Sequence, residues 1–229
     1  MSQILKKSEF IQLYAQIKYS MTKNSSKDQA KLFRFLDKIE NLKSTLRYVS
    51  LKSGRKESSA EHSWRLSLMA FLAAEELKLD IDTDRAVKIA LVHDIAESIT
   101  GDIDAIKIKN GEITKESKNK LEARAMENLR NLAPKKTGSH VYGLWEEYES
   151  GKTKEAKYIK ALDKLETLLQ LSETGHKIYD DPEFMVHYAD KAISNFPELK
   201  NMLIEIKKNL KREFKKGNIL WKKEYDDLN

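Results

Sequence analysis

The chain has 229 residues, which is enough for one domain with a full hydrophobic core, or at most for two small domains. Apolar residues make up 40 % of it and it has only 8 Gly and 3 Pro, which argues against extensive disorder and favours an all-α fold. It contains no cysteine, which excludes disulfides and thiolate metal sites, and its formal charge of +6 permits attraction to anions such as nucleotides.

Apolar residues recur every three to four positions through most of the chain, which is the period of an amphipathic helix. Helix-start signals agree: Ser58 and Glu61 have the spacing of a capping box, and Asp181 precedes a proline. No stretch alternates with a period of two, so no strands are expected. The predicted helices cover 8–20, 28–44, 60–78, 83–98, 116–132, 140–149, 154–175, 183–194 and 198–215.

Two segments interrupt this period. Residues 99–115 contain Gly101 and Gly111 and are expected to form an ordered loop, whereas residues 49–59 are expected to form a polar loop just before His62. We find no internal repeat, low-complexity tract or linker. The sequence therefore predicts a single domain over 1–229, built as a compact all-α helical bundle.

Neither a membrane nor a nucleic acid is indicated as a partner. The N-terminal residues lack the apolar core of a signal peptide, and no run approaches the roughly 18 apolar residues of a spanning helix. The basic run at 205–218 alternates with apolar positions at helical intervals, which is typical of the solvated face of an amphipathic helix. We expect a cytoplasmic protein.

The residues that could carry chemistry lie in three stretches. His62 opens a predicted helix in SSAEHSWRLSLMA, His93 and Asp94 lie in ALVHDIAE, and Asp163 interrupts an apolar stripe in KYIKALDKLETLLQL. A lone histidine on an apolar helix face is usually a satisfied core residue. Here, however, Asp94 adjoins His93 and Glu97 follows one turn later, so these side chains can point toward one side of the helix. A buried carboxylate such as Asp163 needs a strong partner, either an arginine or a metal.

Two imidazoles and two carboxylates form a mixed nitrogen–oxygen ligand set. Such a set suits Mn²⁺, Fe²⁺, Co²⁺, Ni²⁺ or Zn²⁺ better than a thiolate-selective metal. If only four positions are filled, space remains for water and a substrate oxygen, and the ion would make hydroxide available near neutral pH and polarise a phosphoryl oxygen. The other histidines, His140, His176 and His187, are expected at the surface or at helix ends.

The order His62, His93–Asp94, Asp163 resembles the H…HD…D signature of the HD-domain metal-dependent phosphohydrolases. SSAEHSWRLSLMA is similar to the S-x-x-E/D-H-S-x-R/Q helix of their 5′-deoxynucleotidase branch, the YfbR-like and HD domain-containing protein 2-like enzymes. ALVHDIAESITGDI resembles the A-L-x-H-D-x-A-E-x-x-x-G-D-I block of that branch, and LWEEYESGKTKEAKYIKALDKLETLLQ resembles its last characteristic stretch. The similarity spans about residues 35–175.

This resemblance implies a fold and an activity. The family fold is a compact all-helical bundle, and its members remove the 5′-phosphate from deoxyribonucleoside monophosphates with a divalent metal and commonly form homodimers. For this chain we expect the same reaction on (deoxy)ribonucleoside monophosphates, with Mn, Co, Mg, Zn, Ni or Fe as the metal. The resemblance makes His62, His93, Asp94 and Asp163 the metal ligands.

The resemblance also implies roles around the metal. Glu97 and Asp102 match acidic positions linked to catalysis and, together with the carbonyl of Ile103, to a second divalent ion in some relatives. Arg47 matches the arginine that orients the phosphate. The residues expected to contact substrate are Arg47, Tyr48, Asp102, Ile103, Asp104 and Ala105.

The chain departs from the family pattern near this substrate loop. Tyr48 stands where many relatives have Gly-Trp or Trp, Leu46 replaces the usual Pro, and Ala105 replaces a Pro or Thr that often lies nearby. These changes leave the metal ligands intact, so they bear on base and sugar selectivity.

Other functions stay open. An HD-type hydrolase of a pyrophosphate- or triphosphate-containing nucleotide would use the same residues, although the short chain, with no evident regulatory domain, favours a monophosphate. A basic helical module that binds nucleic acid would not need His62 and Asp163 on separate helices, and no nucleic-acid motif is found. A non-catalytic HD scaffold is disfavoured because all four ligands and both acids are present.

Overall fold

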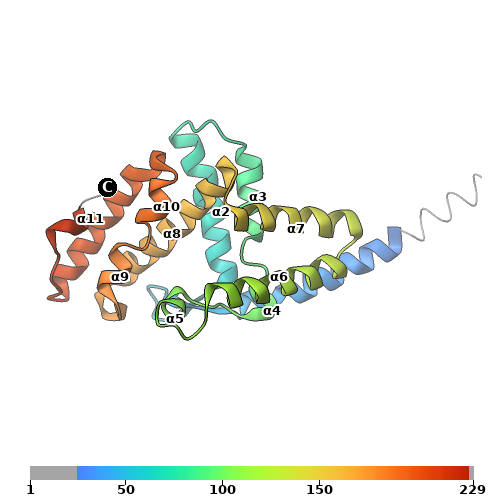
Figure 1. The fold of residues 1–229 in the computed structure, drawn as a ribbon, viewed down its shortest axis with the longest axis horizontal. Coiled ribbons are helices and arrows are strands. Elements are labelled where there is room, and N and C mark those ends of the chain that lie inside the picture. Colours follow the sequence, from blue (N-terminus) through green and yellow to red (C-terminus); the bar gives the residue numbers. More distant parts are fainter. Residues whose placement is uncertain (1–24, 227–229) are drawn as a thin grey trace, which may run out of the picture.

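A long central helix, α8 (Lys154–Thr174), organises residues 25–226, the part of the chain that this computed structural model describes (Figure 1). The side chain of Thr153 caps it by accepting a hydrogen bond from the backbone N–H of Ala156. Apolar and small residues recur on several faces of α8, so it is buried from more than one side. The helices packed against it include α2 (Ser59–Glu76), α3 (Thr83–Val92), α7 (Lys135–Ser150), α10 (Asp190–Ser194) and α11 (Lys200–Lys216). The expected all-α class is confirmed.

Helices α2 and α3 form a hairpin that packs against α8. The predicted capping box starts α2: the Ser58 hydroxyl accepts from the backbone N–H of Glu61, and the Glu61 carboxylate accepts from the backbone N–H of Ser58. Leu66 and Ala70 of α2 and Ile89 of α3 are fully buried in the larger hydrophobic cluster. Burial of this apolar surface holds the hairpin against the central helix.

A second hairpin is formed by α6 (Lys115–Leu132) and α7, and it encloses a smaller hydrophobic cluster that includes Met126 and Trp145. Gly138 allows the two helices to approach closely, because a Cβ at this position would lie 2.3 Å from the backbone oxygen of Arg130. Because α6 and α7 pack as a hairpin, the start of α6 and the end of α7 lie at the same end of it, and residues from both line one cavity beside α8.

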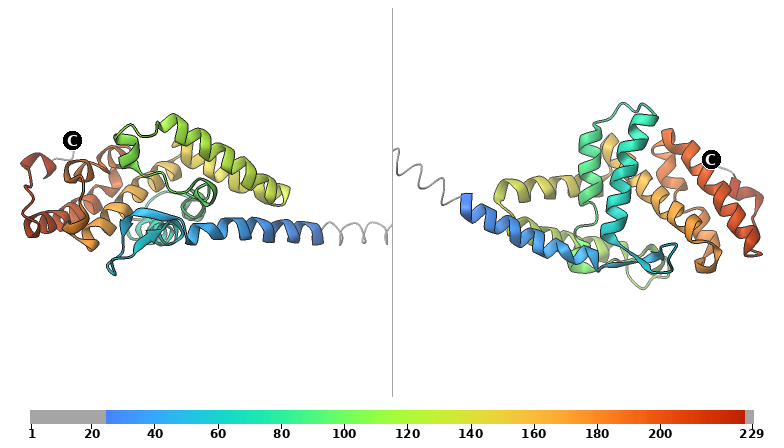
Figure 2. Two further views of the ribbon diagram at one scale, coloured as in Figure 1. Left: turned by 90° about the horizontal axis from the view of Figure 1, so that it is seen from below. Right: turned by 180° about the vertical axis from the view of Figure 1, so that it is seen from behind.

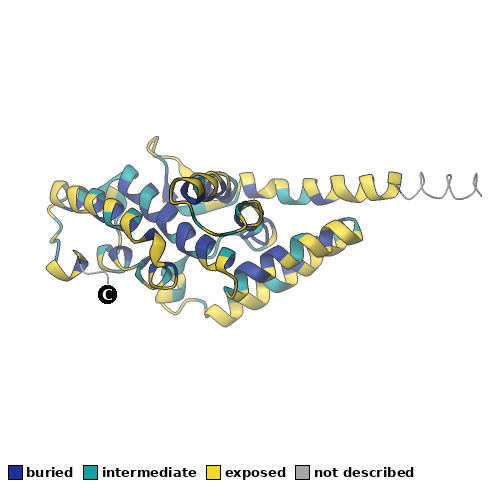
Figure 3. Ribbon diagram, turned by 90° about the horizontal axis from the view of Figure 1, so that it is seen from above, coloured by how far each residue is buried: buried dark blue, intermediate teal, exposed yellow. Residues whose placement is uncertain are grey.

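The N-terminal helix of the described part covers 25–39 and continues into the 3-10 turn η1 (Glu40–Lys43). It projects from the body of the molecule (Figure 2), and most of its residues are exposed (Figure 3). Phe35 and Leu42 are its buried contacts with the smaller cluster. The helix predicted at 8–20 lies outside the described residues.

After α8 the chain turns back through two short helices, α9 (Pro182–Val186) and α10, so the single helix predicted at 183–194 is wrong. Asp181 caps α9 and Pro182 occupies its first position, as expected. Val186, Ala189 and Ile193 keep helical spacing across the break, which is why the periodicity did not reveal it. Short 3-10 turns complete this region: η2 (His176–Ile178), η3 (Pro197–Leu199) and η4 (Lys223–Asp226).

Two short strands correct the expectation that the chain has none. β1 (Leu46–Ser50) pairs antiparallel with β2 (Lys56–Ser58), and the register is irregular between its ends. The segment predicted as a polar loop at 49–59 is therefore partly strand. Neither strand is long enough to show a period of two, and the hairpin is held by α8, where the Gln170 side chain donates to the backbone oxygen of Ser50.

The helix predicted at 83–98 is interrupted. α3 ends at Val92, residues 93–96 form turns, and α4 (Glu97–Thr100) follows. The backbone keeps hydrogen bonds there, but with 3-10 spacing: the N–H of Glu97 donates to the oxygen of Asp94, at 2.9 Å. This tightening keeps the apolar pattern while it changes where consecutive side chains point.

The remaining predicted helices agree with the structure within a few residues, except that α7 begins five residues earlier than predicted, at Lys135 after Pro134. The ordered segment 99–115 contains one short helix, α5 (Ala105–Lys109). In the described residues we find no helix with the length and apolarity needed to cross a membrane.

Candidate metal centre

A cavity of about 640 Å³ opens beside α8 and collects most of the residues singled out in the sequence. Its walls come from β1, the turn after α3, the 102–108 segment, α6, the end of α7, α8, the 178–185 segment and α10. His62 lies beneath it, completely buried. The predicted site residues that line it are Arg47, Tyr48, His93, Asp94, Glu97, Asp102, Ile103, Asp104, Ala105 and Asp163.

His62 lies in the first turn of α2 and faces α8. Its Nδ1 lies 2.5 Å from Oε2 of Glu166, and its Nε2 lies 3.2 Å from Oδ1 of Asp163. Burial and the charge of Arg47 lower the pKa of His62, but Glu166 and Asp163 outweigh them and raise it to about 10. The surroundings of this imidazole therefore favour a positive charge, which a metal ion can supply in place of the proton.

His93 reaches the same point from the end of α3. Its Nδ1 lies 2.8 Å from the backbone oxygen of Ala90, so the ring donates its proton there and presents Nε2 to the cavity. That Nε2 lies 3.0 Å from Oδ2 of Asp94. The ring centroids of His62 and His93 are 5.3 Å apart. Both imidazoles are thus oriented by an acceptor on the far side of the ring.

Two carboxylates complete the cluster. Oδ2 of Asp163 accepts hydrogen bonds from the Tyr148 hydroxyl at 3.0 Å and from Nζ of Lys164 at 2.8 Å, which leaves Oδ1 facing His62. Burial raises the pKa of Asp94, but the neighbouring histidines and Arg47 lower it by more than burial raises it, so the pKa lies below its usual range. Burial also raises the pKa of Asp163, but Lys164 and His62 outweigh burial and hold this pKa well below its usual value, so the carboxylate is ionised.

These donors fit a divalent cation. One ligand atom each from His62, His93 and Asp94 lies within 4.8 Å of the other two. The carboxylate of Asp163 lies against the imidazole of His62. Within the described residues, the buried Nε2 atoms of both histidines make no well-aligned hydrogen bond. Buried polar atoms are seldom left in this state, and imidazole with carboxylate is a typical ligand set for transition metals.

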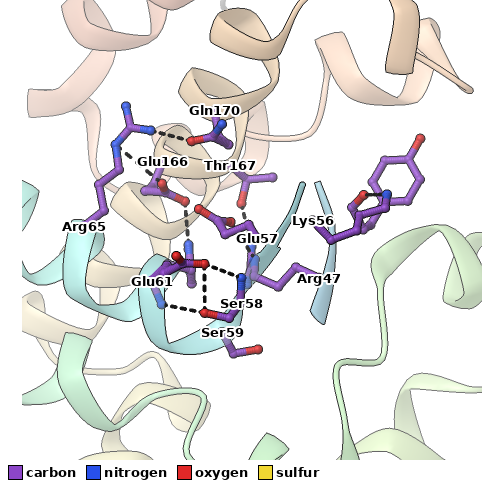
Figure 4. A network of polar contacts seen from close by, with 12 residues as sticks. Arg47, Lys56, Glu57, Ser58, Ser59, Glu61, Arg65, Glu166, Thr167 and Gln170 are labelled. Atoms are coloured by element: carbon purple, nitrogen blue, oxygen red, sulfur yellow. Dashed lines mark hydrogen bonds and ion pairs between the residues drawn. The ribbon is translucent and has the colours of Figure 1, made fainter. Parts of the chain in front are cut away.

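A second group of metal-capable atoms lies nearby, from Glu57, His62 and Glu166, but it has cationic partners already. Nε of Arg47 lies 3.2 Å from Glu57, and Nε of Arg65 lies 3.7 Å from Glu166 (Figure 4). Burial and Glu166 raise the pKa of Glu57 to about 7. We interpret this group as a network that supports His62.

Glu97 and Asp102 line the cavity together with Asp94. Oε2 of Glu97 accepts a hydrogen bond from the Ser59 hydroxyl at 2.6 Å, so α2 holds this carboxylate in place. Burial, followed by the charges of Asp94 and Asp102, raises the pKa of Glu97 well above its usual value. Burial also raises the pKa of Asp102, although Arg47 partly opposes it. Nζ of Lys118 balances this acidic group and donates to the backbone oxygen of Ile103 at 3.3 Å.

Arg47 is one of the residues that line the cavity. It lies on β1 with its side chain mostly buried, and its guanidinium spans the floor of the cavity. Nη1 lies 3.4 Å from Oδ2 of Asp94, and Nη2 donates to the hydroxyl of Thr167 at 3.1 Å. Burial lowers the pKa of Arg47, but the surrounding carboxylates raise it more, so the group stays charged beside the ligands.

The other predicted substrate residues line the cavity in different ways. The Tyr48 hydroxyl donates to Asp180 at 2.8 Å, and burial followed by this contact raises its pKa to about 12. The Asp104 carboxylate caps α5 by accepting from the backbone N–H of Lys107, and Ala105 is the first residue of that helix. The Asp104 side chain therefore already has a structural partner.

Sequence reasoning missed the residues that orient the ligands. Glu166 orients His62, Arg65 contacts Glu166, and Tyr148 and Lys164 hold Asp163. One signal was available, because Glu166 follows Asp163 by three positions on a helix and must share its buried side. The spacing did not reveal that a histidine 104 positions away would be its partner.

Comparisons with known proteins identify the family of this chain. The HD domain family matches residues 39–200. The 5′-deoxynucleotidase HDDC2 of Mus musculus is 34 % identical over 80 % of this chain and 89 % of its own, and the 5′-deoxynucleotidase hdd1 of Schizosaccharomyces pombe is 34 % identical over 75 % and 86 %. A predicted metal-dependent phosphohydrolase from Magnetospirillum magnetotacticum MS-1 superposes with a TM-score of 0.69 at 28 % identity, over 85 % of this chain and 99 % of that one. The chain belongs to the HD-domain family, which confirms the resemblance inferred from its motifs.

Proposed function

We propose that this protein is a metal-dependent phosphohydrolase that removes the 5′-phosphate from (deoxy)ribonucleoside monophosphates. The observation that carries the proposal is the pair of buried Nε2 atoms of His62 and His93, which lie together with Asp94 below a cavity that also holds a charged arginine. The relatives named 5′-deoxynucleotidase support the substrate class, because this chain covers most of their length.

In this proposal His62, His93, Asp94 and Asp163 hold one divalent cation, which can be Mn, Co, Mg, Zn, Ni or Fe. When bound, such an ion lowers the pKa of a water and polarises a phosphoryl oxygen. The chain contributes the orientation: Glu166 and the oxygen of Ala90 set the two imidazoles, and Tyr148 and Lys164 set Asp163.

Arg47 binds the phosphate in this scheme. Its guanidinium already lies within 3.4 Å of Asp94, and its planar fork can hold two phosphoryl oxygens. Glu97 and Asp102 carry protons to and from the reacting oxygens, or hold a second ion together with the carbonyl of Ile103. Tyr48, Asp104 and Ala105 border the space left for sugar and base.

We also propose that the protein is a homodimer in the cytoplasm. Helix α2 presents an apolar stripe away from its buried face: Trp64, Leu68, Phe71 and Leu72 are all exposed, and Trp64 keeps 65 % of its surface. Spacings of three, four and seven residues place them on one side of the helix. Burying such a stripe against a second copy would remove a contiguous apolar patch from water. Sedimentation of the wild type and of Trp64→Glu would test this, and cell fractionation would test the location.

The decisive experiment is a screen of nucleoside 5′-monophosphates for phosphate release, with Mn²⁺, Co²⁺, Mg²⁺ and Zn²⁺ in turn. We expect release of inorganic phosphate from deoxyribonucleoside monophosphates, and its loss after chelation. Release of pyrophosphate or triphosphate from longer nucleotides, with monophosphates untouched, would favour the alternative HD-type hydrolase.

A further inference from the structure

Helix α8 carries a row of lysines that starts at the candidate metal centre and leads away from it. Lys157, Lys160 and Lys164 lie at spacings of three and four residues, so they share one face, and all three line the cavity. Lys164 adjoins Asp163 and is paired with it. At about 1.5 Å per residue, Lys160 lies roughly 6 Å and Lys157 roughly 10 Å further along the helix axis.

The opposite wall of this part of the cavity is α10, which runs back along α8 (Figure 1). Tyr188 fixes the register, because its hydroxyl accepts a hydrogen bond from Nζ of Lys164 at 3.1 Å. Lys191 and Asn195, one and two turns beyond Tyr188, also line the cavity. We call the space between Lys157 and Lys160 on α8, Lys191 on α10 and Asn195 just after α10 the lysine arm.

The lysine arm carries positive charge that the described part of the chain does not neutralise. There, no carboxylate oxygen is found within 4.0 Å of Nζ of Lys157, Lys160 or Lys191. Nζ of Lys160 lies 4.0 Å from the centroid of the Tyr148 ring, and burial lowers its pKa despite the nearby charge of Glu149. Asp163 also acts on Lys160, but it is already paired with Lys164, so the three lysines of the arm can attract an anion.

We propose that the lysine arm binds a second phosphate group of the nucleotide, so that nucleotides with two phosphates are preferred over 5′-monophosphates. The inference rests on the proposed function, because that function places the first phosphate at the metal centre. Lysine binds a phosphate group as a point charge, so a phosphate dianion suits a space bordered by several lysines that are unpaired in the described part of the chain. The second phosphate can be borne at the 3′ position or as the second unit of a 5′-diphosphate.

The test compares a nucleoside 5′-monophosphate, its 3′,5′-bisphosphate and its 5′-diphosphate on the full chain. Relative kcat/KM is measured with metal, and binding by calorimetry after chelation, where no turnover occurs. We expect one of the doubly phosphorylated nucleotides to exceed the monophosphate by about tenfold in both measurements, the size of one charge-assisted hydrogen bond. Whichever of the two is preferred identifies the position of the second phosphate.

Substitution then assigns the preference to the arm. Lys160→Gln and Lys191→Gln should each reduce the ratio of doubly to singly phosphorylated nucleotide by about tenfold. Lys152→Gln, an exposed lysine just before α8 that does not line the cavity, is the matched control and should leave the ratio unchanged. Equal affinity of the wild type for one and two phosphates, or an unchanged ratio in both arm variants, would overturn the inference. Absence of hydrolysis with the binding preference intact would refute only the proposed function.

Discussion

His62 and His93 present the same ring nitrogen, Nε2, to the carboxylates of the candidate metal centre, but the protein holds them in different ways. Nδ1 of His62 contacts a side chain, Glu166, which is itself contacted by Arg65. Nδ1 of His93 contacts the backbone oxygen of Ala90, three residues earlier on the same helix. One half of the site therefore depends on a chain of side chains from α2 and α8, whereas the other half is built into the end of α3.

This difference predicts how each half can fail. The half around His62 can be loosened by substituting a residue that never touches the metal. Around His93, by contrast, the acceptor of Nδ1 is a peptide oxygen, which every substitution of Ala90 retains. No single substitution can remove this orienting contact, although the ring also packs edge-on against Tyr148, with ring centroids 5.1 Å apart.

The largest effect is expected from substituting a candidate ligand, Asp94, in the half of the site around His93. Asp94→Asn removes an anionic donor from the cluster, so we expect loss of bound metal and of phosphatase activity while the helical circular dichroism persists. Asp84→Asn, an exposed aspartate on α3 paired with Lys88, is the control. Full metal occupancy with normal turnover in Asp94→Asn would refute the ligand assignment.

A smaller effect is expected one turn further on, at Glu97. Glu97→Gln keeps the shape, and its amide oxygen can still accept the hydrogen bond from Ser59, but it cannot ionise. If Glu97 carries protons, turnover should fall by about 10²- to 10⁴-fold with the primary metal retained. If it holds a second ion instead, high Mg²⁺ or Mn²⁺ should restore part of the rate. Turnover equal to wild type in both conditions would remove Glu97 from the mechanism.

Arg47 links the two halves, because its guanidinium contacts Asp94 on one side and Thr167 of α8 on the other. Lysine keeps the charge but cannot make both contacts, so Arg47→Lys separates geometry from charge. We expect kcat/KM for nucleoside monophosphates to fall by about 10- to 150-fold, with metal content unchanged. Wild-type kinetics in both Arg47→Lys and Arg47→Ala would show that this residue does not bind the phosphate.

The smallest effect tests the comparison itself. Glu166→Gln leaves every ligand in place but weakens the acceptor that orients His62, and we expect about 10- to 100-fold weaker metal binding, measured by titration with Mn²⁺. Glu173→Gln is the matched control, since Glu173 lies on the same helix and pairs with Arg65, whereas the carboxylate that contacts His62 belongs to Glu166. Equal metal affinity in Glu166→Gln and the wild type would mean that packing alone determines the orientation of the His62 ring.

Much of the architecture was determined by local features of the sequence. Helical periodicity and the capping signals at Ser58 and Asp181 predicted most helices, because a helix forms from contacts between residues three and four positions apart. The order of the histidine and aspartate motifs predicted the family, and the structure brings those residues to one cavity. The periodicity did not predict the break in the helix at 93–96, because the 3-10 turns there preserve the apolar spacing.

What only the tertiary structure decided involves partners far apart in the chain. The short hairpin of β1 and β2 depends on α8, the orientation of His62 depends on a glutamate 104 residues away, and the buried position of Arg47 depends on Thr167, 120 residues away. The lysine arm likewise exists only because α10 folds back beside α8. Hydrogen bonds and ion pairs of this kind form between surfaces that packing brings together, and no local period in the sequence records which surfaces will meet.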